Sequence, residues 1–391
     1  MTALDVISAL AGIAPGSALA ALREQRPEAT LHAQGSYNAL FDPTTPVGLA
    51  LADRFAIALR VASIHAAPEA AAHYRTRLLS AGADAATVDA AASTSGSTAG
   101  LSARLAAILT HVDMVTTHPI DATADDLDKL AAAGLPTVEI VQLAQIVAYT
   151  SFQVRVIRGL QLLGAGSGTV TASQPVVTVP RVSLPPATVV RPPAGSLKSP
   201  TVFTRQQLAW TPWLVGVDPA EATPAQVVAL EKRKGNVPYF RLLALDVDVL
   251  EERTATDLGI FYTHGGAPRA ERELAAGATS RLNGCIYCAS QHARVAAQLA
   301  KREADVDRLL EQGIDAIPAL ELGERWEGIV DFAVELSRTP AAATDAHVSR
   351  LRAAGLTDLE VLDVAQAAAF FSWANRLMLT LGEPYFPEGT A

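Results

Sequence analysis

Apolar positions recur with a helical period over most of the chain. In residues 53–79 and again in 138–163, apolar side chains stand at i, i+3, i+4 and i+7, the pattern of a helix that buries one stripe. Thr123 and Gly134 are residue types that commonly begin and end helices. Residues 1–165 show no apolar-polar alternation typical of half-buried strands. The pattern therefore predicts an all-α fold.

This pattern breaks after Gly164, where proline becomes dense. Prolines at this density exclude a helix, because each lacks an amide hydrogen and clashes with the preceding turn, and they favour an extended linker. We therefore expect a helical domain at 1–165, a Pro/Val-rich linker at 166–204 and a second helical domain at 205–391. The prolines are Pro175, Pro180, Pro185, Pro186, Pro192, Pro193 and Pro200.

Helical patterning returns in the second half. Thr223 followed by Pro224 is typical of a helix N-cap with proline at the first helical position. Residues 235–238 predict a break in the helix. From Phe240 the helical period runs to the C-terminus, apart from a turn at 263–268.

The two halves repeat one another. Residues 134–155 and 355–376 align without gaps, and the same offset pairs Pro119 with Pro340 and Thr123 with Thr344. Matched glycine, glutamine, serine and arginine are harder to obtain by chance than matched alanines, so we interpret the chain as two copies of one domain. The matched pairs are Gly134/Gly355, Leu135/Leu356, Glu139/Glu360, Ala144/Ala365, Gln145/Gln366, Ala148/Ala369, Ser151/Ser372 and Arg155/Arg376.

When the alignment is extended backwards with a two-residue shift, it predicts that the first copy lacks the two thiols and the carboxylate. It pairs His73/His292, Ala66/Cys285, Glu69/Cys288 and Arg54/Glu273. The first copy is therefore a degenerate domain without cysteines, which keeps a histidine and cannot carry out dithiol chemistry.

Charge and hydropathy narrow the class of protein. The 391 residues carry a net charge of −9 with a pI near 5.4, so neither nucleic acid nor an anionic membrane would attract the chain. The N-terminus contains Asp5 and no leading positive charge, unlike a signal peptide. No uninterrupted apolar run reaches the roughly 18 residues of a membrane span. We expect a cytoplasmic protein.

Cysteine occurs only as Cys285 and Cys288, with His292 four residues later. Asn283-Gly284 predicts the end of one helix, and a new helix is expected to begin near Cys285. At about 100° per residue, the two cysteines and the histidine then lie within about 60° on one face. Thiols in a first turn feel the positive helix end, which stabilises a thiolate. The spacing indicates redox chemistry with His292 as proton acceptor.

Other interpretations of this stretch remain open. The acid that would orient His292 is Glu271 or Glu273, which lie about 200° apart on the preceding helix and cannot both face it. A zinc site would need a fourth ligand, and only an isolated His264 is nearby. A pair of buried structural thiols is the remaining alternative.

Glu273, Cys285-Ile-Tyr-Cys288 and His292, with Asn283-Gly284 before the first cysteine, resemble the alkylhydroperoxidase D-like branch of the carboxymuconolactone decarboxylase superfamily. Residues 222–224 and 235–240 are similar to peroxidase-related members. The resemblance covers 205–391 and, through the repeat, 1–165.

The resemblance implies an all-helical fold and reduction of organic hydroperoxides. It implies that Cys288 attacks the peroxide, that Cys285 resolves, and that His292 and Glu273 form the proton relay. It further implies no bound cofactor, an external dithiol reductant such as a protein-borne lipoyl group, and assembly as a homo-oligomer, either a trimer of two-domain chains or a dimer. Tyr287 lies between the thiols and is expected to line the substrate pocket.

Two other functions remain open at this point. The wider superfamily includes decarboxylase and lactone chemistry that needs no cysteine pair. A non-catalytic redox sensor would form the disulfide without turnover.

Overall fold

The protein is described by a computed structural model that covers residues 5–44, 47–164, 166, 168, 184–233 and 237–388. Within these residues the fold is all-α, with one short two-stranded ribbon, as predicted. The first half contains α1 (Val6–Leu10), α2 (Ala18–Glu24), α3 (Pro27–Phe41), α4 (Leu51–Ile64), α5 (Pro68–Ser80), α6 (Ala85–Ala92), α7 (Ala103–Thr117), η1 (Pro119–Asp121), α8 (Ala124–Ala132) and α9 (Thr137–Leu162).

The second half repeats this order of helices. From α3 to α9, each helix of the first half corresponds to the helix nine labels later, so that α3 matches α12 and α9 matches α18. The elements are β1 (Ala209–Pro212), α10 (Pro224–Glu231), α11 (Pro238–Leu243), α12 (Val247–Phe261), α13 (Arg269–Leu282), α14 (Ile286–Ala300), α15 (Glu303–Gln312), η2 (Ile314–Ala319), α16 (Glu324–Ser337), α17 (Asp345–Ala353), α18 (Asp358–Thr380) and β2 (Gly382–Tyr385).

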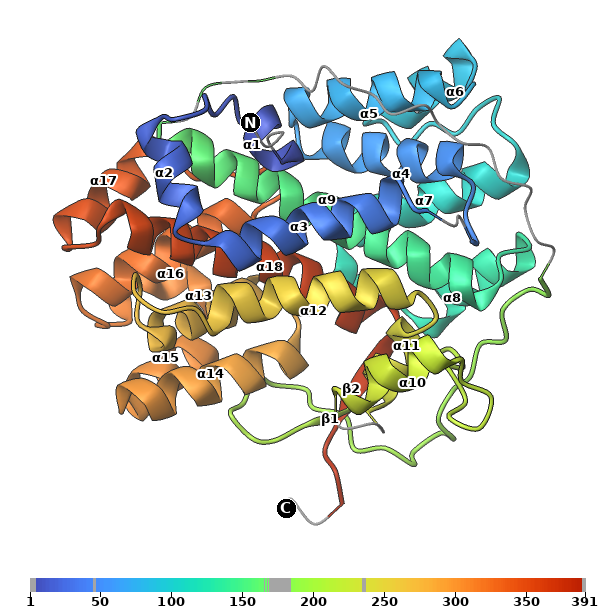
Figure 1. Cartoon of the computed structure of the whole chain (residues 1–391). Coiled ribbons are helices and arrows are strands. Elements are labelled where there is room, and N and C mark those ends of the chain that lie inside the picture. The colour runs from blue at the N-terminus through green and yellow to red at the C-terminus, as the bar shows by residue number, and fades with distance from the viewer. Residues whose placement is uncertain are drawn as a thin grey trace.

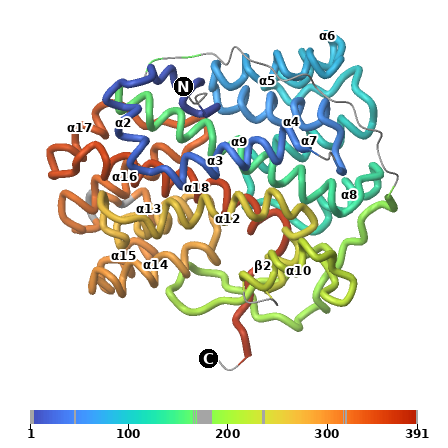
Figure 2. The backbone as a smooth tube through the Cα atoms, viewed as in Figure 1, coloured from blue at the N-terminus to red at the C-terminus, as the bar shows by residue number. Residues whose placement is uncertain are grey.

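The halves pack against each other through matching helices. α9 lies beside α18 at the centre, and α3 lies beside α12 across the front (Figure 1). The backbone trace shows the same two pairs (Figure 2). At the α9–α18 seam, the Trp373 ring stands edge-on to Tyr149 with 5.2 Å between centroids, and its Nε1 donates to Gln145 Oε1 at 2.9 Å. The seam is a shared hydrophobic core.

Two buried arginines tie the halves together reciprocally. Arg155 of α9 donates to the carbonyl oxygens of Ser337 (2.7 Å) and Arg338 (3.1 Å) at the end of α16. Its counterpart Arg376 of α18 donates to the Thr116 carbonyl (2.7 Å) at the end of α7. The last carbonyls of a helix lack partners within the helix, so each half satisfies a helix end of the other.

Two expectations about local structure were wrong. Residues 53–79 do not form one helix: the chain breaks at Ala66, which adopts φ +50°, and Pro68 begins α5. A proline at the first turn is a start signal. The C-terminal helical period also ends early, because Gly382–Tyr385 pairs antiparallel with Ala209–Pro212. These strands are four residues long and contain proline, so they carry almost no alternation.

The predicted linker lies partly outside the described residues, at 167 and 169–183. Its described part follows the surface of the helices. The Ala187 amide donates to the Leu135 carbonyl (2.9 Å), and the Val190 amide donates to the Trp213 carbonyl (2.8 Å). The domain boundaries themselves remain a prediction.

Among the described residues, one helix has the length and hydropathy of a membrane span. This helix is α9, whose most apolar window is completely buried inside the fold. Burial of that kind is typical of a helix in the core of a fold.

Candidate functional site

The α13–α14 corner brings four predicted site residues together. α13 ends at Leu282, and Gly284 turns the chain with φ +78°. Only glycine adopts this conformation readily, and a Cβ here would also collide with the Ile120 side chain of the first half. Cys285 is the N-cap of α14, and Cys288 follows in its first turn. The turn therefore fixes both thiols at a helix N-terminus.

Glu273 and His292 form a close ion pair across this corner. His292 Nδ1 donates to Glu273 Oε2 at 2.5 Å, and Arg269 Nε donates to Oε1 at 3.0 Å. Burial acts to raise the pKa of Glu273, but His292 and Arg269 together bring it below its ordinary value. Burial also acts to lower the pKa of His292, and the Glu273 hydrogen bond and charge outweigh it, so this pKa is raised. Both shifts favour the charged forms of the pair.

Glu273 rather than Glu271 is therefore the carboxylate that faces the histidine. Glu271 points to the other side of α13, where it accepts from Arg325 Nε (2.6 Å) and Nη2 (2.8 Å). The two carboxylates lie on different faces, as the helical phase predicts.

The two cysteines are free, buried and unlike one another. Burial, followed by the hydrogen bond to Cys288 and the Cys288 charge, raises the pKa of Cys285 well above its ordinary value. Burial opposes ionisation of Cys288 as well, but the hydrogen bond from Cys285 and the positive charge of His292 lower its pKa. Cys288 is thus the thiol that ionises first.

Asn375 of α18 supports both thiols. Its Nδ2 donates to Ser280 Oγ (3.0 Å), and its Oδ1 accepts from Asn283 Nδ2 (2.9 Å). Hydrogen bonding to Asn375 also lowers the pKa of Cys288 and opposes the raised pKa of Cys285. This fully buried amide links the turn, α13 and the thiols.

The remaining walls come from α12 and α18. Phe371 of α18 stands edge-on to the His292 ring at 4.1 Å between centroids, and Phe261 of α12 lies 5.9 Å from it. Arg253 and Asp257 lie two turns and one turn before Phe261 on α12, and their charges act on Cys288 and His292 respectively. Sequence reasoning missed Arg253, Asp257 and Asn375.

The comparison of the two halves could have identified two of these residues, Arg253 and Asn375. Asn375 aligns with Val154 at the offset of the matched α9 and α18 segments. Since α3 and α12 are both 15 residues long, Arg253 aligns with Ala33 in the same way. A polar residue at a position where the other copy is apolar therefore marks the site.

The sequence analysis also considered Tyr287 as a pocket residue and His264 as a metal ligand. Tyr287 is half-buried, and burial, with the charges of Cys288 and Cys285, raises its pKa to about 12. Within the described residues, no group of three or more histidine, cysteine or acidic side chains is placed to hold a metal ion, and His264 joins no such group. Trp373 and Phe370 belong to the buried seam.

The alignment of the first half with this corner was wrong by one residue. α5 begins at Pro68 and α14 at Ile286, and the left-handed residues before them are Ala66 and Gly284. Arg54 and Arg272 confirm this register, since both are buried and donate to backbone carbonyls. The corrected pairs are Phe55/Glu273, Ala67/Cys285, Ala70/Cys288 and Tyr74/His292.

His73 is therefore not the counterpart of His292. It is hydrogen-bonded through Nε2 to Tyr37 Oη at 2.8 Å, and burial followed by the Arg77 charge lowers its pKa to about 4. The first half lacks not only both thiols and the carboxylate but also the histidine.

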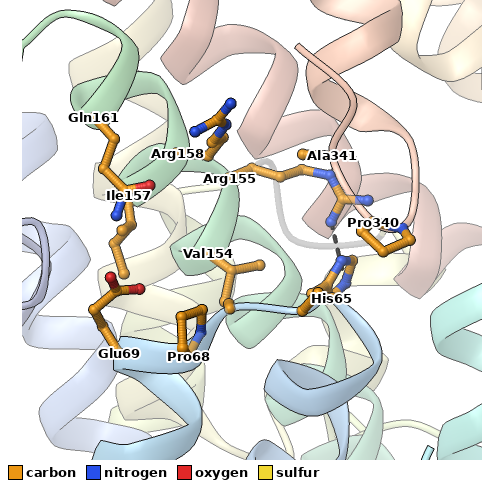
Figure 3. Close-up of a pocket in the computed structure, with 12 residues that line it drawn as sticks. His65, Pro68, Glu69, Val154, Arg155, Ile157, Arg158, Gln161, Pro340 and Ala341 are labelled. Atoms are coloured by element: carbon orange, nitrogen blue, oxygen red, sulfur yellow. Dashed lines mark hydrogen bonds between the residues drawn. The ribbon is translucent and has the colours of Figure 1, made fainter. Parts of the chain in front are cut away.

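A cavity of about 290 Å³ opens beside the first-half corner. Figure 3 shows that His65 and Arg155 meet at its edge, where their side-chain nitrogens lie 3.3 Å apart. Burial, followed by the charges of Arg155 and Arg376, lowers the pKa of His65 well below its ordinary value. Arg155 already donates to the carbonyl oxygens at the end of α16. Its guanidinium is therefore not free to bind an anion in this cavity.

Comparison with known proteins places this corner in a family. Residues 248–318, which run from α12 through α13 and α14, match the carboxymuconolactone decarboxylase family. The second half carries a carboxymuconolactone decarboxylase family domain. All four residues of the corner lie inside the matched segment of this family domain.

Solved structures similar to the chain include two peroxidase-related proteins. An alkylhydroperoxidase AhpD core protein from Ralstonia eutropha JMP134 is 25% identical over 41% of this chain and 85% of that chain, with a TM-score of 0.36. A peroxidase-related protein from Silicibacter sp. TM1040 is 23% identical over 43% of this chain and 91% of that chain, with a TM-score of 0.36. The comparison with curated proteins found no match.

Proposed function

We propose that the protein is a dithiol peroxidase that reduces organic hydroperoxides at the α13–α14 corner. One observation carries the proposal: a buried C-x-x-C pair, with the pKa of one thiol lowered and of the other raised, lies beside Glu273 and His292, whose Oε2 and Nδ1 atoms are 2.5 Å apart. A nucleophile, a base and an orienting carboxylate in this order are what thiol chemistry requires.

In the first step, the Cys288 thiolate attacks the terminal oxygen of the hydroperoxide, the one that carries the hydrogen. A sulfur–oxygen bond forms as the oxygen–oxygen bond breaks, and the leaving alkoxide takes a proton from His292 to become an alcohol. Glu273 holds the imidazole through Nδ1 and compensates its charge before the proton leaves. Cys288 is left as a sulfenic acid.

In the second step, Cys285 resolves that sulfenic acid. The neutral His292 accepts the Cys285 proton, the thiolate attacks the Cys288 sulfur, and the hydroxide that leaves takes the proton to form water. The raised pKa of Cys285 keeps it protonated until this step. An external dithiol, for which a protein-borne lipoyl group has the required chemistry, then returns two electrons and two protons to the disulfide.

The first half takes a structural part in this proposal. Its corner offers no thiol, carboxylate or histidine at the matched positions, yet Ile120 packs on Gly284 and Arg155 holds the end of α16. We assign 1–165 as a degenerate copy of the family domain, 166–204 as the linker and 205–391 as the active copy. The chain is expected to work in the cytoplasm and to assemble further into a homo-oligomer.

Turnover with excess small dithiol tests the proposal. Wild type should consume an organic hydroperoxide over many cycles, and Cys288→Ser should be inactive. Cys285→Ser should reduce about one equivalent of peroxide and then accumulate the Cys288 sulfenic acid, which a sulfenic-acid trap and mass spectrometry detect. Ser290→Ala, on the same helix and outside the reacting set, is the matched control.

Three results would contradict the proposal. Turnover in Cys288→Ser would make the thiol a bystander. A single disulfide-forming event without turnover, with every dithiol offered, would identify a redox sensor. Turnover of a lactone or a β-keto acid that persists when both cysteines are replaced would identify the decarboxylase or lactone chemistry of the superfamily.

A further inference from the structure

Arg253 of α12 is a buried cation without a polar partner. The residue is only 5% exposed. Across the part of the chain that the structure describes, no group hydrogen-bonds or ion-pairs with its guanidinium. Asp257, one turn further along α12, forms no ion pair with it, although the charge of Arg253 acts against the rise that burial gives the pKa of that carboxyl. A buried charge that lacks a partner is costly, and such groups in folded proteins are normally paired.

Three aromatic rings surround the guanidinium instead. Its central carbon lies 5.0 Å from the centroid of Phe370, 5.7 Å from that of Tyr239 and 5.8 Å from that of Trp373. Cation–π contacts stabilise the charge. They leave the in-plane N–H groups, the five donors that arginine uses to bind oxygen atoms, without acceptors.

Tyr239 contributes a second unpartnered polar group. Its hydroxyl oxygen is buried and has no hydrogen-bond partner among the described residues. The neighbouring indoles do not share this deficit, since Trp210 Nε1 donates to the Met378 carbonyl and Trp373 Nε1 to Gln145, both at 2.9 Å. Among the described residues, Arg253 Nε and the Tyr239 hydroxyl are thus buried polar groups without a hydrogen-bond partner.

Both groups lie within electrostatic reach of Cys288. Burial works to raise the pKa of this thiol, and Arg253 is among the groups that lower it. The Tyr239 pKa is raised, chiefly by burial, and the Cys288 charge adds to the effect. Neither side chain hydrogen-bonds to the sulfur itself. A polar group of a substrate bound next to the Cys288 sulfur could therefore accept hydrogen bonds from Arg253 and Tyr239.

The first half differs at the position that matches Arg253. The position of Arg253 is occupied there by Ala33, which is buried among apolar side chains. The arginine thus accompanies the thiols and is absent where they are absent. A purely structural arginine would be equally useful in either copy.

We propose that Arg253 and Tyr239 bind the carboxylate of an acidic organic hydroperoxide whose peroxide group reacts with Cys288. The planar guanidinium matches the two oxygens of a carboxylate, and the tyrosine hydroxyl supplies a further donor. The inference rests on the proposed peroxidase function and names the class of its substrate.

A matched pair of substrates tests the inference: a fatty-acid hydroperoxide and its methyl ester, which differ only in the charge of the carboxyl group. Wild type should favour the acid in kcat/KM by at least about tenfold, as a charge-assisted hydrogen bond implies. Arg253→Met should remove this preference, and Tyr239→Phe should reduce it several-fold. Arg233→Met, which removes an arginine already paired with Glu251 at 2.8 Å, should keep it.

Binding without chemistry separates this inference from the proposed function. The corresponding hydroxy acid should quench tryptophan fluorescence in wild type and in Cys288→Ser, more weakly in Tyr239→Phe, and not in Arg253→Met. Binding of the acid without turnover of any hydroperoxide would support the site and overturn the peroxidase. Equal turnover of acid and ester by wild type, or equal loss of both in Arg253→Met, would overturn the site and leave the peroxidase standing. Because Tyr239→Phe removes one oxygen only, it keeps the test valid if Arg253→Met does not fold.

Discussion

The α4–α5 and α13–α14 corners have the same backbone arrangement but different side chains: aromatic rings in the first, and a charged pair with two thiols in the second. Both turn through a left-handed residue into a helix of the same phase. In the first, Phe41 packs on Phe55 at 5.8 Å and on Tyr74 at 5.1 Å between ring centroids. In the second, the positions of Phe55 and Tyr74 hold a charged pair, and two thiols replace alanines.

The difference teaches that this backbone corner can form without the thiols, the carboxylate and the histidine. An aromatic cluster fills one copy, and the polar groups of the other copy need support from outside the corner. This support comes from Asn375, where the first copy has Val154, and from Asp257, where it has Tyr37. The charged corner therefore depends on more side chains from outside the corner than the aromatic corner does.

The largest effect is expected at the seam that the copies share. Trp373→Ala should lower the free energy of unfolding by about 3–5 kcal/mol, the usual range for a large buried ring. Because Trp373 touches Tyr149 and Phe152 of the first half, both halves should lose stability together. Denaturant unfolding, followed by tryptophan fluorescence and by circular dichroism, measures this. Two separate transitions, with only one moved, would show that the corners are independent units.

The second-largest effect is expected on turnover, from loss of the Glu273–His292 pair of the α13–α14 corner. Glu273→Gln should reduce turnover about 10²-fold at neutral pH, the lower range for loss of acid–base support. The substitution removes the charge that raises the His292 pKa, so the alkaline limb of the residual pH profile should move to lower pH. Steady-state rates across pH measure it. Glu271→Gln, on the opposite face of α13, is the control that should leave the profile in place.

The same pair also makes a prediction for stability. The Glu273 pKa is lowered in the folded state, so its contribution exists above the unfolded pKa and is lost as pH falls through the folded one. The His292 pKa is raised, so its contribution exists below the unfolded value and is lost as pH rises through the folded one. The Tm difference between wild type and Glu273→Gln should therefore peak between the two folded pKa values. A difference that is constant across pH would exclude this ion pair as its source.

The smallest effect tests the support of the thiols. Asn375→Val gives the second copy the residue of the first and should raise the Cys288 pKa, since the amide helps to lower it. At a pH below that pKa the thiolate fraction falls, and alkylation by iodoacetamide should slow several-fold, as one weak hydrogen bond implies. The pH dependence of alkylation measures the shift. An unchanged curve would mean that Asn375 only packs.

Local patterns predicted the parts of this site that lie close together in sequence. Asn283-Gly284 marked the turn, and helical phase placed Cys288 and His292 on one face. The repeat was visible because matched polar residues serve the seam and the arginine contacts. Glu273 could be chosen over Glu271 only through the family resemblance, because the phase says that the two diverge but not which one faces inward.

The missed features depend on contacts that no local pattern records. The register slipped by one residue because the left-handed position is Gly284 in one copy and Ala66 in the other, which hides their equivalence. Arg253 and Asn375 reach the thiols from α12 and α18, far along the chain. The ribbon of β1 and β2 is held by pairing across more than 170 residues, for which four-residue strands leave no periodic trace.

The reciprocal arginine contacts have the symmetry of a two-fold dimer, in which residue i of one subunit meets residue j of the other and the reverse also holds. In a homodimer every mutation appears on both subunits at once, so neither subunit can lose its active site alone. Once the two copies share one gene, they can change separately. One copy can then exchange its chemistry for packing while Arg155 continues to serve the other. A single chain with this symmetry therefore allows changes at one corner that a homodimer would have to make at both.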